Sequence, residues 1–337
     1  MTEPNPTIRL SLPSKGRLAE DCLSFLAACG LPVYKPNPRQ YEAVLPAVPD
    51  LHVLFQRPVD IAVSVRDGSV TFGITGRDVV EEFKGENSDV ILLHNALNFG
   101  GCTLNLAVPE DWQNVLCVPD LTDRARQLGR PLRVATKYPT LAGRFLAQHN
   151  VPYQLVHAEG TLETAPAIGY ADLICDIVSS GQTLRDNRLR PLPDGVLLTS
   201  QAVLLANRQA LRRNPSALPA ARQLLEYFEA YLRASDNLAV FVNMRGDSPE
   251  AIAERIFQEC RIHGLQGPTI SRVILPQDSQ SWYAVNLIVP RRDLFQTIQD
   301  LRRIGGSGVV AVPVTYIFEE EPPRYTAMLA ALNDLND

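Results

Sequence analysis

The sequence predicts an α/β protein followed by a separate C-terminal domain. Short apolar segments of strand length alternate with helical repeats of apolar residues up to about residue 206, which is typical of largely parallel sheets covered by helices. A second order of elements, β-α-β-β-α-β, lies between residues 237 and 318. With 337 residues and 45% hydrophobic composition, the chain is long enough for two or three domains with their own cores.

The first elements are a strand, a loop and a helix. Residues 8–13 form an apolar run of strand length, and Leu18, Cys22 and Phe25 recur at helical spacing until Gly30, a residue that often ends helices. Further strands are expected at the later apolar runs, which are residues 61–65, 72–74, 90–93, 104–108, 132–135, 153–156, 173–178 and 195–206.

Two segments rich in proline and polar residues interrupt this alternation. We interpret residues 112–119 as a crossing between domains and residues 214–219 as a linker. A bridging helix is expected at residues 221–232, where leucine and phenylalanine recur at helical spacing. The acidic tail after residue 319 is expected to be weakly helical and to fray.

The C-terminal domain has helix signals of its own. Ser248 is a good N-cap and Pro249 suits the first helical position, and Ile252, Ile256 and Cys260 then line one face. A second helix around residues 294–301 and four strands complete a ferredoxin-like order, a module that often binds small ligands or partners. The four strands are expected at residues 237–244, 270–275, 283–289 and 308–318.

Composition and charge exclude several classes of protein. The net charge of −5 gives no cationic surface for nucleic acid. The polar N-terminus and the short apolar runs indicate neither a signal peptide nor a membrane span, so a cytoplasmic protein is expected. The six cysteines form no CxxC pair and the five histidines are dispersed, which predicts neither a zinc site nor a disulfide framework.

The segment 171–184 is the most informative for function. An apolar strand delivers Asp176 into a loop with Ser179, Ser180, Gly181 and Thr183, where backbone amides and hydroxyls could bind a sugar phosphate. A carboxylate at the end of such a strand could hold ribose hydroxyls or a metal-bound diphosphate. An ordinary strand-turn-helix junction with a serine cap would contain the same residues, and this segment alone does not separate the two interpretations.

Neighbouring strand ends carry similar groups. Lys137 follows one predicted strand, and the run Glu159, Gly160, Thr161 leads from the next strand to Glu163. Because carboxyl ends of parallel strands meet at one edge of a sheet, these groups could join the same site. Taken singly, Lys137 could be a solvated surface lysine and Glu163 a helix acid that interacts with the helix dipole.

Two further turns enter helices in the first half of the chain. Lys15, Gly16 and Arg17 stand between a strand and a helix, where the cations could meet a triphosphate or a leaving diphosphate. Gly76 and Asp78 occupy a second strand-turn-helix junction of the same form. A solvated basic turn and a simple helix cap by Asp78 are the alternative interpretations.

Together these motifs resemble those of the ATP phosphoribosyltransferase family in its long form. The signature is carried by Glu163, Gly169, Asp176, Ser180, Gly181, Thr183 and Leu184. The same order of motifs is found in Pro-Ser-Lys-Gly-Arg at residues 13–17, Gly-Ile-Thr-Gly at 73–76 and Ala-Thr-Lys-Tyr-Pro at 135–139. Residues 267–271 and 282–290 resemble the C-terminal regulatory domain of the long form.

The chain departs from the family pattern in places. Thr71 stands where an acid is common, Ser14 separates the opening proline from its lysine, and the proline-rich segment 31–56 has no evident match. These departures leave a catalytically inactive regulatory subunit as an alternative. A bilobal sensor of nucleotides or amino acids is a second alternative, although the phosphate loop is intact. A third alternative is a different phosphoribosyltransferase, of the type whose strand ends in two adjacent acids. Cys175 stands in the place of one of those acids, which argues against this alternative.

The resemblance implies a bilobal fold similar to periplasmic binding proteins. It places catalytic domain I at residues 1–108 with 195–213, catalytic domain II at 109–194, the regulatory domain at 220–320 and a tail at 321–337. It implies transfer of the phosphoribosyl group from phosphoribosyl pyrophosphate to N1 of ATP, the first step of histidine biosynthesis. Mg²⁺ would be held mainly by the diphosphate and not by a dedicated protein cluster.

The resemblance also assigns roles to individual residues. The catalytic residues would be Asp176, Glu163, Lys15 and Arg17. Phosphoribosyl pyrophosphate would contact Asp176, Ser179, Ser180, Gly181, Gln182, Thr183, Glu159, Gly160 and Thr161. ATP would contact Lys15, Gly16, Arg17, Gly76, Asp78 and Lys137. Histidine would inhibit from the C-terminal domain, with Asn243, Thr269 and Ser307 as candidate contacts, and the enzyme would be a homo-oligomer, either a dimer or a hexamer.

Overall fold

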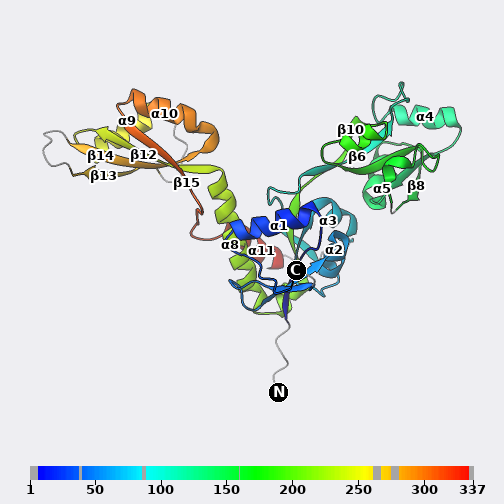
Figure 1. Ribbon diagram of the computed structural model, residues 1–337, viewed down its shortest axis with the longest axis horizontal. Helices are drawn as coiled ribbons and strands as arrows, with labels where there is room; N and C mark the ends of the chain where they lie inside the picture. The colour runs from blue at the N-terminus through cyan, green and yellow to red at the C-terminus, as the bar shows by residue number, and fades with distance from the viewer. Residues whose placement is uncertain are drawn as a thin grey trace, which may run out of the picture. The chain divides into compact units, whose positions relative to one another are not determined.

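A computed structural model describes residues 7–37, 40–85, 89–158, 160–260, 267–274 and 281–333. The chain forms two compact units, one of Met1–Gln223 with Arg324–Asp337 and one of Leu224–Pro323 (Figure 1). The first unit contains two sheets with helices packed on them, and the second contains one antiparallel sheet. This arrangement confirms the predicted α/β fold class, with two α/β lobes and a separate C-terminal domain.

The first lobe is built on a mixed sheet of six strands, with two parallel and three antiparallel pairs of neighbours, and not on the largely parallel sheet expected. Their order is β2 (Glu42–Val44), β3 (Leu51–Gln56), β1 (Ile8–Pro13), β4 (Phe72–Gly76), β11 (Ala202–Asn207) and β5 (Val90–His94). The three helices that follow β1, β3 and β4 are α1 (Arg17–Ala28), α2 (Pro58–Arg66) and α3 (Arg77–Phe83). Gly30, at φ +77°, ends α1 as predicted.

One predicted strand of this lobe was wrong. Residues 61–65 lie inside α2, whose first turn begins at Pro58. Ile61, Ala62 and Val65 are all buried and recur at helical spacing. A short, continuously apolar run has the same composition in a buried strand and in a buried helix turn, so periodicity could not separate the two.

Gly73 on β4 lies directly beneath α2. A Cβ at this position would lie 2.6 Å from Cγ2 of Ile61 and 3.1 Å from Cγ2 of Val65. We expect Gly73→Ala to lower the free energy of unfolding by about 1–3 kcal/mol, because α2 must move away from the sheet. Urea denaturation measures this change, with Gly101→Ala as the control since no atom lies within 4 Å of the corresponding Cβ. Equal stability of the two variants would contradict the close packing of α2 on β4.

The second lobe is built on a mixed sheet of five strands. Their order is β10 (Leu189–Ser200), β6 (Cys102–Pro109), β9 (Leu173–Val178), β7 (Leu132–Thr136) and β8 (Tyr153–His157). β7 runs parallel to β8 and β9, whereas β6 runs antiparallel to β9 and β10. Helices α4 (Asp120–Leu128) and α5 (Pro139–Gln148) contribute Leu121, Ala142 and Leu146 to the buried core of this lobe.

Strand pairing shows where the chain passes between the two sheets. It leaves the first sheet after His94 and returns at Ala202, so β6 and β10 both belong to the second sheet. The expected domain boundaries lay at 108/109 and 194/195 instead. The segment 112–119, interpreted as the crossing, lies within the second lobe, where Val115 and Val118 are buried in the core. Proline and polar residues there mark a surface loop and not a change of domain.

The C-terminal unit has the predicted order β-α-β-β-α-β. Its four strands lie in the order β13 (Thr269–Val273), β14 (Trp282–Pro290), β12 (Asn237–Arg245) and β15 (Ser307–Pro313). Helices α9 (Pro249–Glu259) and α10 (Leu294–Arg303) lie over one face of this sheet (Figure 1). The Oγ of Ser248 accepts a hydrogen bond of 3.2 Å from the N–H of Ala251, which confirms the predicted cap.

Two helices adjoin the boundary between the units. α8 (Ala217–Ser235) begins in the first unit and ends in the second, and it is longer than the bridging helix expected at residues 221–232. α11 (Pro323–Asn333) returns to the first unit, where Met328 and Leu332 are buried. The side chains of Arg208 and Arg212 donate hydrogen bonds to the carbonyls of Ala331 and Leu332. These contacts hold the end of α11 on the first unit. No helix within the described ranges has the length and hydrophobicity needed to cross a bilayer.

Candidate functional site

A cavity of about 800 Å³ opens in the first unit, between elements of its two lobes. The first lobe lines it with residues that follow β1, β3 and β4, and the second lobe with residues that follow β7 and β9. These positions are the carboxyl ends of strands, where open α/β sheets place their ligands. The predicted site residues among its lining are Lys15, Arg17, Gly76, Asp78, Lys137 and Ser179.

The wall from the first lobe is rich in exposed cations. Lys15 is exposed, and the side chain of Arg17 is 88% exposed with Asp21 at 3.6 Å as an ion-pair partner. Gly16, between them, has a φ of +78°, and no atom lies within 4 Å of the position of a Cβ there. Arg57, which the sequence analysis missed, adds a cation from the start of α2. Such a wall suits a ligand that carries several phosphates.

Asp176 is half-buried on β9, next to the cavity residue Ile177. Burial raises the pKa of its carboxyl, and the nearby charge of Glu163 acts in the same direction. The N–H of Ile177, which donates to Oδ1 at 2.8 Å, and the charge of Lys137 oppose this rise. The charges of Glu163 and Lys137 thus both act on Asp176 at this edge of the second sheet.

The loop after β9 has the features of an anion-binding loop. Gly181 has a φ of +71°, and the Oγ of Ser180 accepts a hydrogen bond of 3.4 Å from the N–H of Gln182. Among the described residues, no acceptor contacts the backbone N–H groups of Ser179, Ser180 or Gly181. The helix that follows, α6 (Gln182–Asp186), is only five residues long. Its dipole is accordingly small, so the amides and hydroxyls must supply most of any attraction for an anion.

The remaining predicted contacts of this lobe lie around the same strand ends. Gly160 and Thr161 are exposed and precede the 3₁₀ turn Leu162–Thr164, which contains Glu163. Gln182 and Thr183 are exposed in the first turn of α6. These residues and Asp176 are not part of the cavity lining named above, although Ser179 and Lys137 are. Glu159 lies outside the described residues.

Asp78 is 6% exposed and its carboxylate is fully engaged. Oδ2 accepts a hydrogen bond of 2.7 Å from the hydroxyl of Tyr138, and Oδ1 accepts one of 2.5 Å from Ser200. Burial and the charge of Asp78 raise the pKa of Tyr138, so the phenol stays protonated and donates. A Cβ at Gly76 would overlap Oδ1 of Asp78, which explains the glycine at this turn.

Three further residues of this region were not predicted from the sequence: Tyr138, Ser200 and Glu82. Glu82 is 7% exposed, and its carboxylate accepts hydrogen bonds from the second lobe. Tyr138 belongs to the Ala-Thr-Lys-Tyr-Pro motif, so its presence there was a usable signal. No local pattern marks Ser200 or Glu82, because their partners are 122 and 58 residues away in sequence.

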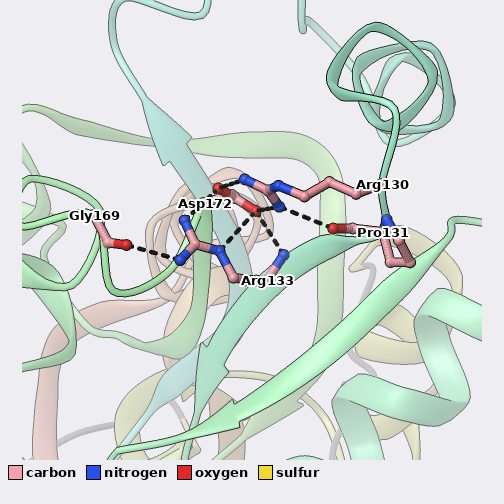
Figure 2. A network of polar contacts seen from close by, with 5 residues as sticks. All are labelled: Arg130, Pro131, Arg133, Gly169 and Asp172. Atoms are coloured by element: carbon pink, nitrogen blue, oxygen red, sulfur yellow. Dashed lines mark hydrogen bonds and ion pairs between the residues drawn. The ribbon is translucent and has the colours of Figure 1, made fainter.

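A network of charged side chains supports the opposite end of β9. The carboxylate of Asp172, which is 9% exposed, accepts hydrogen bonds from Arg130 at 2.6 and 2.8 Å and from Arg133 at 3.0 Å. Figure 2 shows Asp172 between the two guanidinium groups, with Arg133 also reaching the carbonyl of Gly169 at 2.8 Å. Burial alone would raise the pKa of Asp172, but these hydrogen bonds hold it well below its usual range.

The three candidate regulatory residues lie on the sheet of the C-terminal unit. Asn243 on β12 pairs with Ser307 on β15, and the Oγ of Ser307 donates to the carbonyl of Asn243 at 3.4 Å. Thr269 lies on β13, on the far side of β14. All three are exposed, and the alternation of buried and exposed residues along β12 places Asn243 on the face opposite α9 and α10. Asn243 and Ser307 thus come together, and Thr269 does not contact them.

Within the described parts of the chain, no three histidine, cysteine or acidic side chains gather as a possible metal site. Asp176 and Glu163, whose charges influence each other, are two acids near the loop after β9. Two carboxylates offer hard oxygen ligands, which suit Mg²⁺ when most other ligands come from substrate phosphates and water.

Two family models match the chain. The model described as HisG, ATP phosphoribosyltransferase, matches residues 57–230. The model of the HisG C-terminal domain matches residues 234–316. Together they cover most of the residues that line the cavity and almost all of the C-terminal unit.

Curated relatives match over nearly the whole chain. A protein of Arabidopsis thaliana named ATP phosphoribosyltransferase 2, chloroplastic, is 44% identical, over 96% of this chain and 80% of the relative. An ATP phosphoribosyltransferase of Rhodopseudomonas palustris is 34% identical, over 96% of this chain and 98% of the relative. The solved complex of ATP phosphoribosyl transferase, HisG:HisZ, from Thermotoga maritima is similar in fold, with a TM-score of 0.52 and 24% identity. That match covers 66% of this chain and 98% of the solved chain.

Proposed function

Because the chain belongs to the ATP phosphoribosyltransferase family, an enzyme family that carries out the first step of histidine biosynthesis, we propose that the cavity between its lobes is the active site. The observation that carries this proposal is the lining of the cavity. Lys15, Arg17 and Arg57 line it from the first lobe, Lys137 and Ser179 line it from the second lobe, and Asp176 is adjacent to the lining residue Ile177. Such a site offers a carboxylate for a sugar and cations for two polyphosphates.

Phosphoribosyl pyrophosphate would occupy the side of the second lobe. Its 5-phosphate would accept hydrogen bonds from the amides and hydroxyls of the loop from Ser179 to Thr183. Asp176 and Glu163 would accept hydrogen bonds from the ribose hydroxyls, since charge-assisted hydrogen bonds to carboxylates are strong in a half-buried site. Gly160 and Thr161 would add contacts at the same edge of the sheet, together with Glu159.

ATP would occupy the side of the first lobe. Lys15, Arg17 and Lys137 would neutralise its triphosphate and the leaving diphosphate, and Gly16 leaves room for a phosphate to approach the backbone. Asp78 was expected to contact ATP directly. Because both of its carboxylate oxygens already accept hydrogen bonds from Tyr138 and Ser200, we assign Asp78 and Gly76 a supporting role in the cavity wall.

Mg²⁺ fits this set of residues as an ion held mainly by the diphosphate, with Asp176 and Glu163 as candidate protein ligands. When bound, the ion would neutralise charge on the leaving diphosphate. The side chains would place N1 of adenine in line with C1 of the ribose, and Asp176 would stabilise the positive charge that develops on the sugar. A closed cavity would exclude the water that could hydrolyse the activated sugar.

The C-terminal unit would bind histidine as a feedback inhibitor on the sheet face that carries Asn243 and Ser307. The exposed amide of Asn243 and the hydroxyl of Ser307 suit the carboxylate and amino groups of an amino acid. Thr269 would contribute only from a second ligand position or from another copy of the chain, since it lies beyond β14. Assembly into a homo-oligomer and a cytoplasmic location stay predictions.

The direct test mixes the purified full-length protein with ATP, phosphoribosyl pyrophosphate and Mg²⁺ and follows the formation of phosphoribosyl-ATP. We expect product formation that histidine suppresses. We further expect Asn243→Ala to raise the half-inhibitory histidine concentration about tenfold, the loss of roughly one hydrogen bond to a charged group, without changing kcat.

The control for this variant is Gln258→Ala, a substitution of an exposed residue on α9. Equal sensitivity of both variants to histidine would remove Asn243 from the regulatory site. Absence of product when both substrates bind would contradict the active-site assignment and favour a binding or regulatory subunit.

A further inference from the structure

The start of α5 is capped by a carboxylate from the other lobe. Glu82 on α3 accepts hydrogen bonds from the backbone N–H groups of Thr140 at 2.8 Å and Leu141 at 2.9 Å. The first N–H groups of a helix have no partner within the helix, and the N-cap residue Tyr138 supplies no side-chain cap here. Because Pro139 has no N–H, the two oxygens of Glu82 satisfy the first two N–H groups within α5.

A second carboxylate of α3 holds the same turn. Asp78 precedes Glu82 by one helical turn, so both side chains lie on one face of α3. Asp78 accepts the hydroxyl of Tyr138 at 2.7 Å, and the Oγ of Ser200 both donates to Asp78 at 2.5 Å and accepts from its N–H at 3.0 Å. Both carboxylates are less than 8% exposed, and hydrogen bonds to buried charges are stronger than those in water.

Lys137 lies immediately before the turn that these carboxylates hold. This lysine directly precedes Tyr138, is exposed, lines the cavity and interacts with the charge of Asp176. A shift of the first turn of α5 would therefore move the Lys137 ammonium relative to both the cations of the first lobe and the carboxylate of Asp176. A misplacement of 1 Å in a positioning group can cost a large factor in rate.

We propose that Glu82 and Asp78 are positioning residues, which hold the first turn of α5 across the two lobes and so fix Lys137 for the reaction. The role of Lys137 rests on the proposed function, whereas the cap of α5 does not. A carboxylate is required at residue 82 because both oxygens must accept. In a glutamine, the amide NH₂ would face one of the two backbone N–H groups.

The first test compares Glu82→Gln with Glu81→Gln in the full-length protein. Glu81 is the matched control, since it loses the same charge on the same helix but pairs with Lys84 at 2.6 Å and Arg77 at 3.7 Å instead of α5. We expect amide hydrogen exchange at Thr140 and Leu141 to be about tenfold faster in Glu82→Gln, in proportion to the loss of a charged hydrogen bond, and unchanged in Glu81→Gln. Unchanged amide hydrogen exchange at Thr140 and Leu141 in Glu82→Gln would show that Glu82 does not cap α5.

The second test asks whether Glu82 acts through Lys137. We expect Glu82→Gln to lower kcat/KM about tenfold in the native sequence but to have little further effect in a Lys137→Ala background. An equal loss in both backgrounds would show a general structural role and overturn the positioning role. A normal kcat/KM in Lys137→Ala itself would overturn the proposed active-site role of Lys137, and with it the positioning role of Glu82. The hydrogen-exchange measurement would still show whether Glu82 caps α5.

Tyr138→Phe provides a gentler variant should Glu82→Gln fold poorly. It removes only the hydroxyl that donates to Asp78 and keeps the ring. We expect a smaller fall in kcat/KM, about threefold, that also disappears in the Lys137→Ala background. A threefold fall that persists in that background would argue against positioning through Lys137.

Discussion

Asp176→Asn is expected to lower kcat/KM by about 100-fold or more, the scale of roughly 3 kcal/mol for a charged hydrogen bond lost at the transition state. In the proposed site this carboxylate accepts hydrogen bonds from ribose and faces the carbon where positive charge develops. An amide keeps the shape but loses the negative charge. Steady-state kinetics with both substrates measures the change, and an unchanged kcat/KM would remove Asp176 from the reaction.

The same substitution is expected to leave thermal stability unchanged or to raise it slightly. Burial raises the pKa of Asp176, so the folded state holds the proton more tightly than the unfolded chain does. Above the unfolded pKa of about 3.9, ionised Asp176 therefore costs stability, and asparagine removes that cost. Loss of activity with retained stability would separate a functional carboxylate from a structural one. Asp123→Asn, at an exposed ion pair on α4, is the control and should change neither quantity.

Much of the site could be predicted because its groups follow strands directly. Asp176, Ser179 and Lys137 each stand within a few residues of a strand end, so local sequence alone brings them to one edge of a sheet. Glu82 and Ser200 could not be predicted in this way. Their partners come from the other lobe, and a single sequence carries no pattern that links residues 58 or 122 positions apart.

The fold shows the same division between local and distant information. Ser248 as a helix cap and Gly30 as a helix end depend on their immediate neighbours, and both predictions are confirmed. Residues 61–65 were predicted as a strand but lie in α2. The packing of Ile61 and Val65 on Gly73 shows which residues face the sheet, and this contact cannot be read from the local sequence. The pairing of β6 with β9 and β10 is likewise a tertiary property. It shows that the chain crosses between the lobes after His94 and again before Ala202, and not at residues 112–119.

Two carboxylates of the second lobe, near opposite ends of β9, thus have opposite electrostatic surroundings. Asp176 is disfavoured as an anion by burial and by Glu163, as a residue that awaits a ligand would be. Asp172, at the other end of β9, is favoured as an anion by two arginines. One end of the strand is stabilised by paired charges, and the other bears an acid that, in the proposed function, takes substrate groups as its partners.

Asp172→Asn is accordingly expected to act on stability and not on chemistry. It would lower the free energy of unfolding at pH 7 by about 2–3 kcal/mol, less than for a fully buried pair because both arginines are partly exposed. The variant would leave the guanidinium groups of Arg130 and Arg133 without their shared carboxylate. Urea denaturation of both proteins measures this difference at neutral pH, and an identical midpoint would show that the network in Figure 2 contributes nothing.

The pH dependence of this difference distinguishes charge from shape. The folded pKa of Asp172 lies below its unfolded value, so its contribution is present above about pH 4 and declines as the pH falls through the window between the two values. The stabilities of the native protein and of Asp172→Asn should therefore converge below about pH 4. A difference that stays constant down to pH 3 would assign the effect to packing, because a neutral Asp172 and an asparagine differ little in charge.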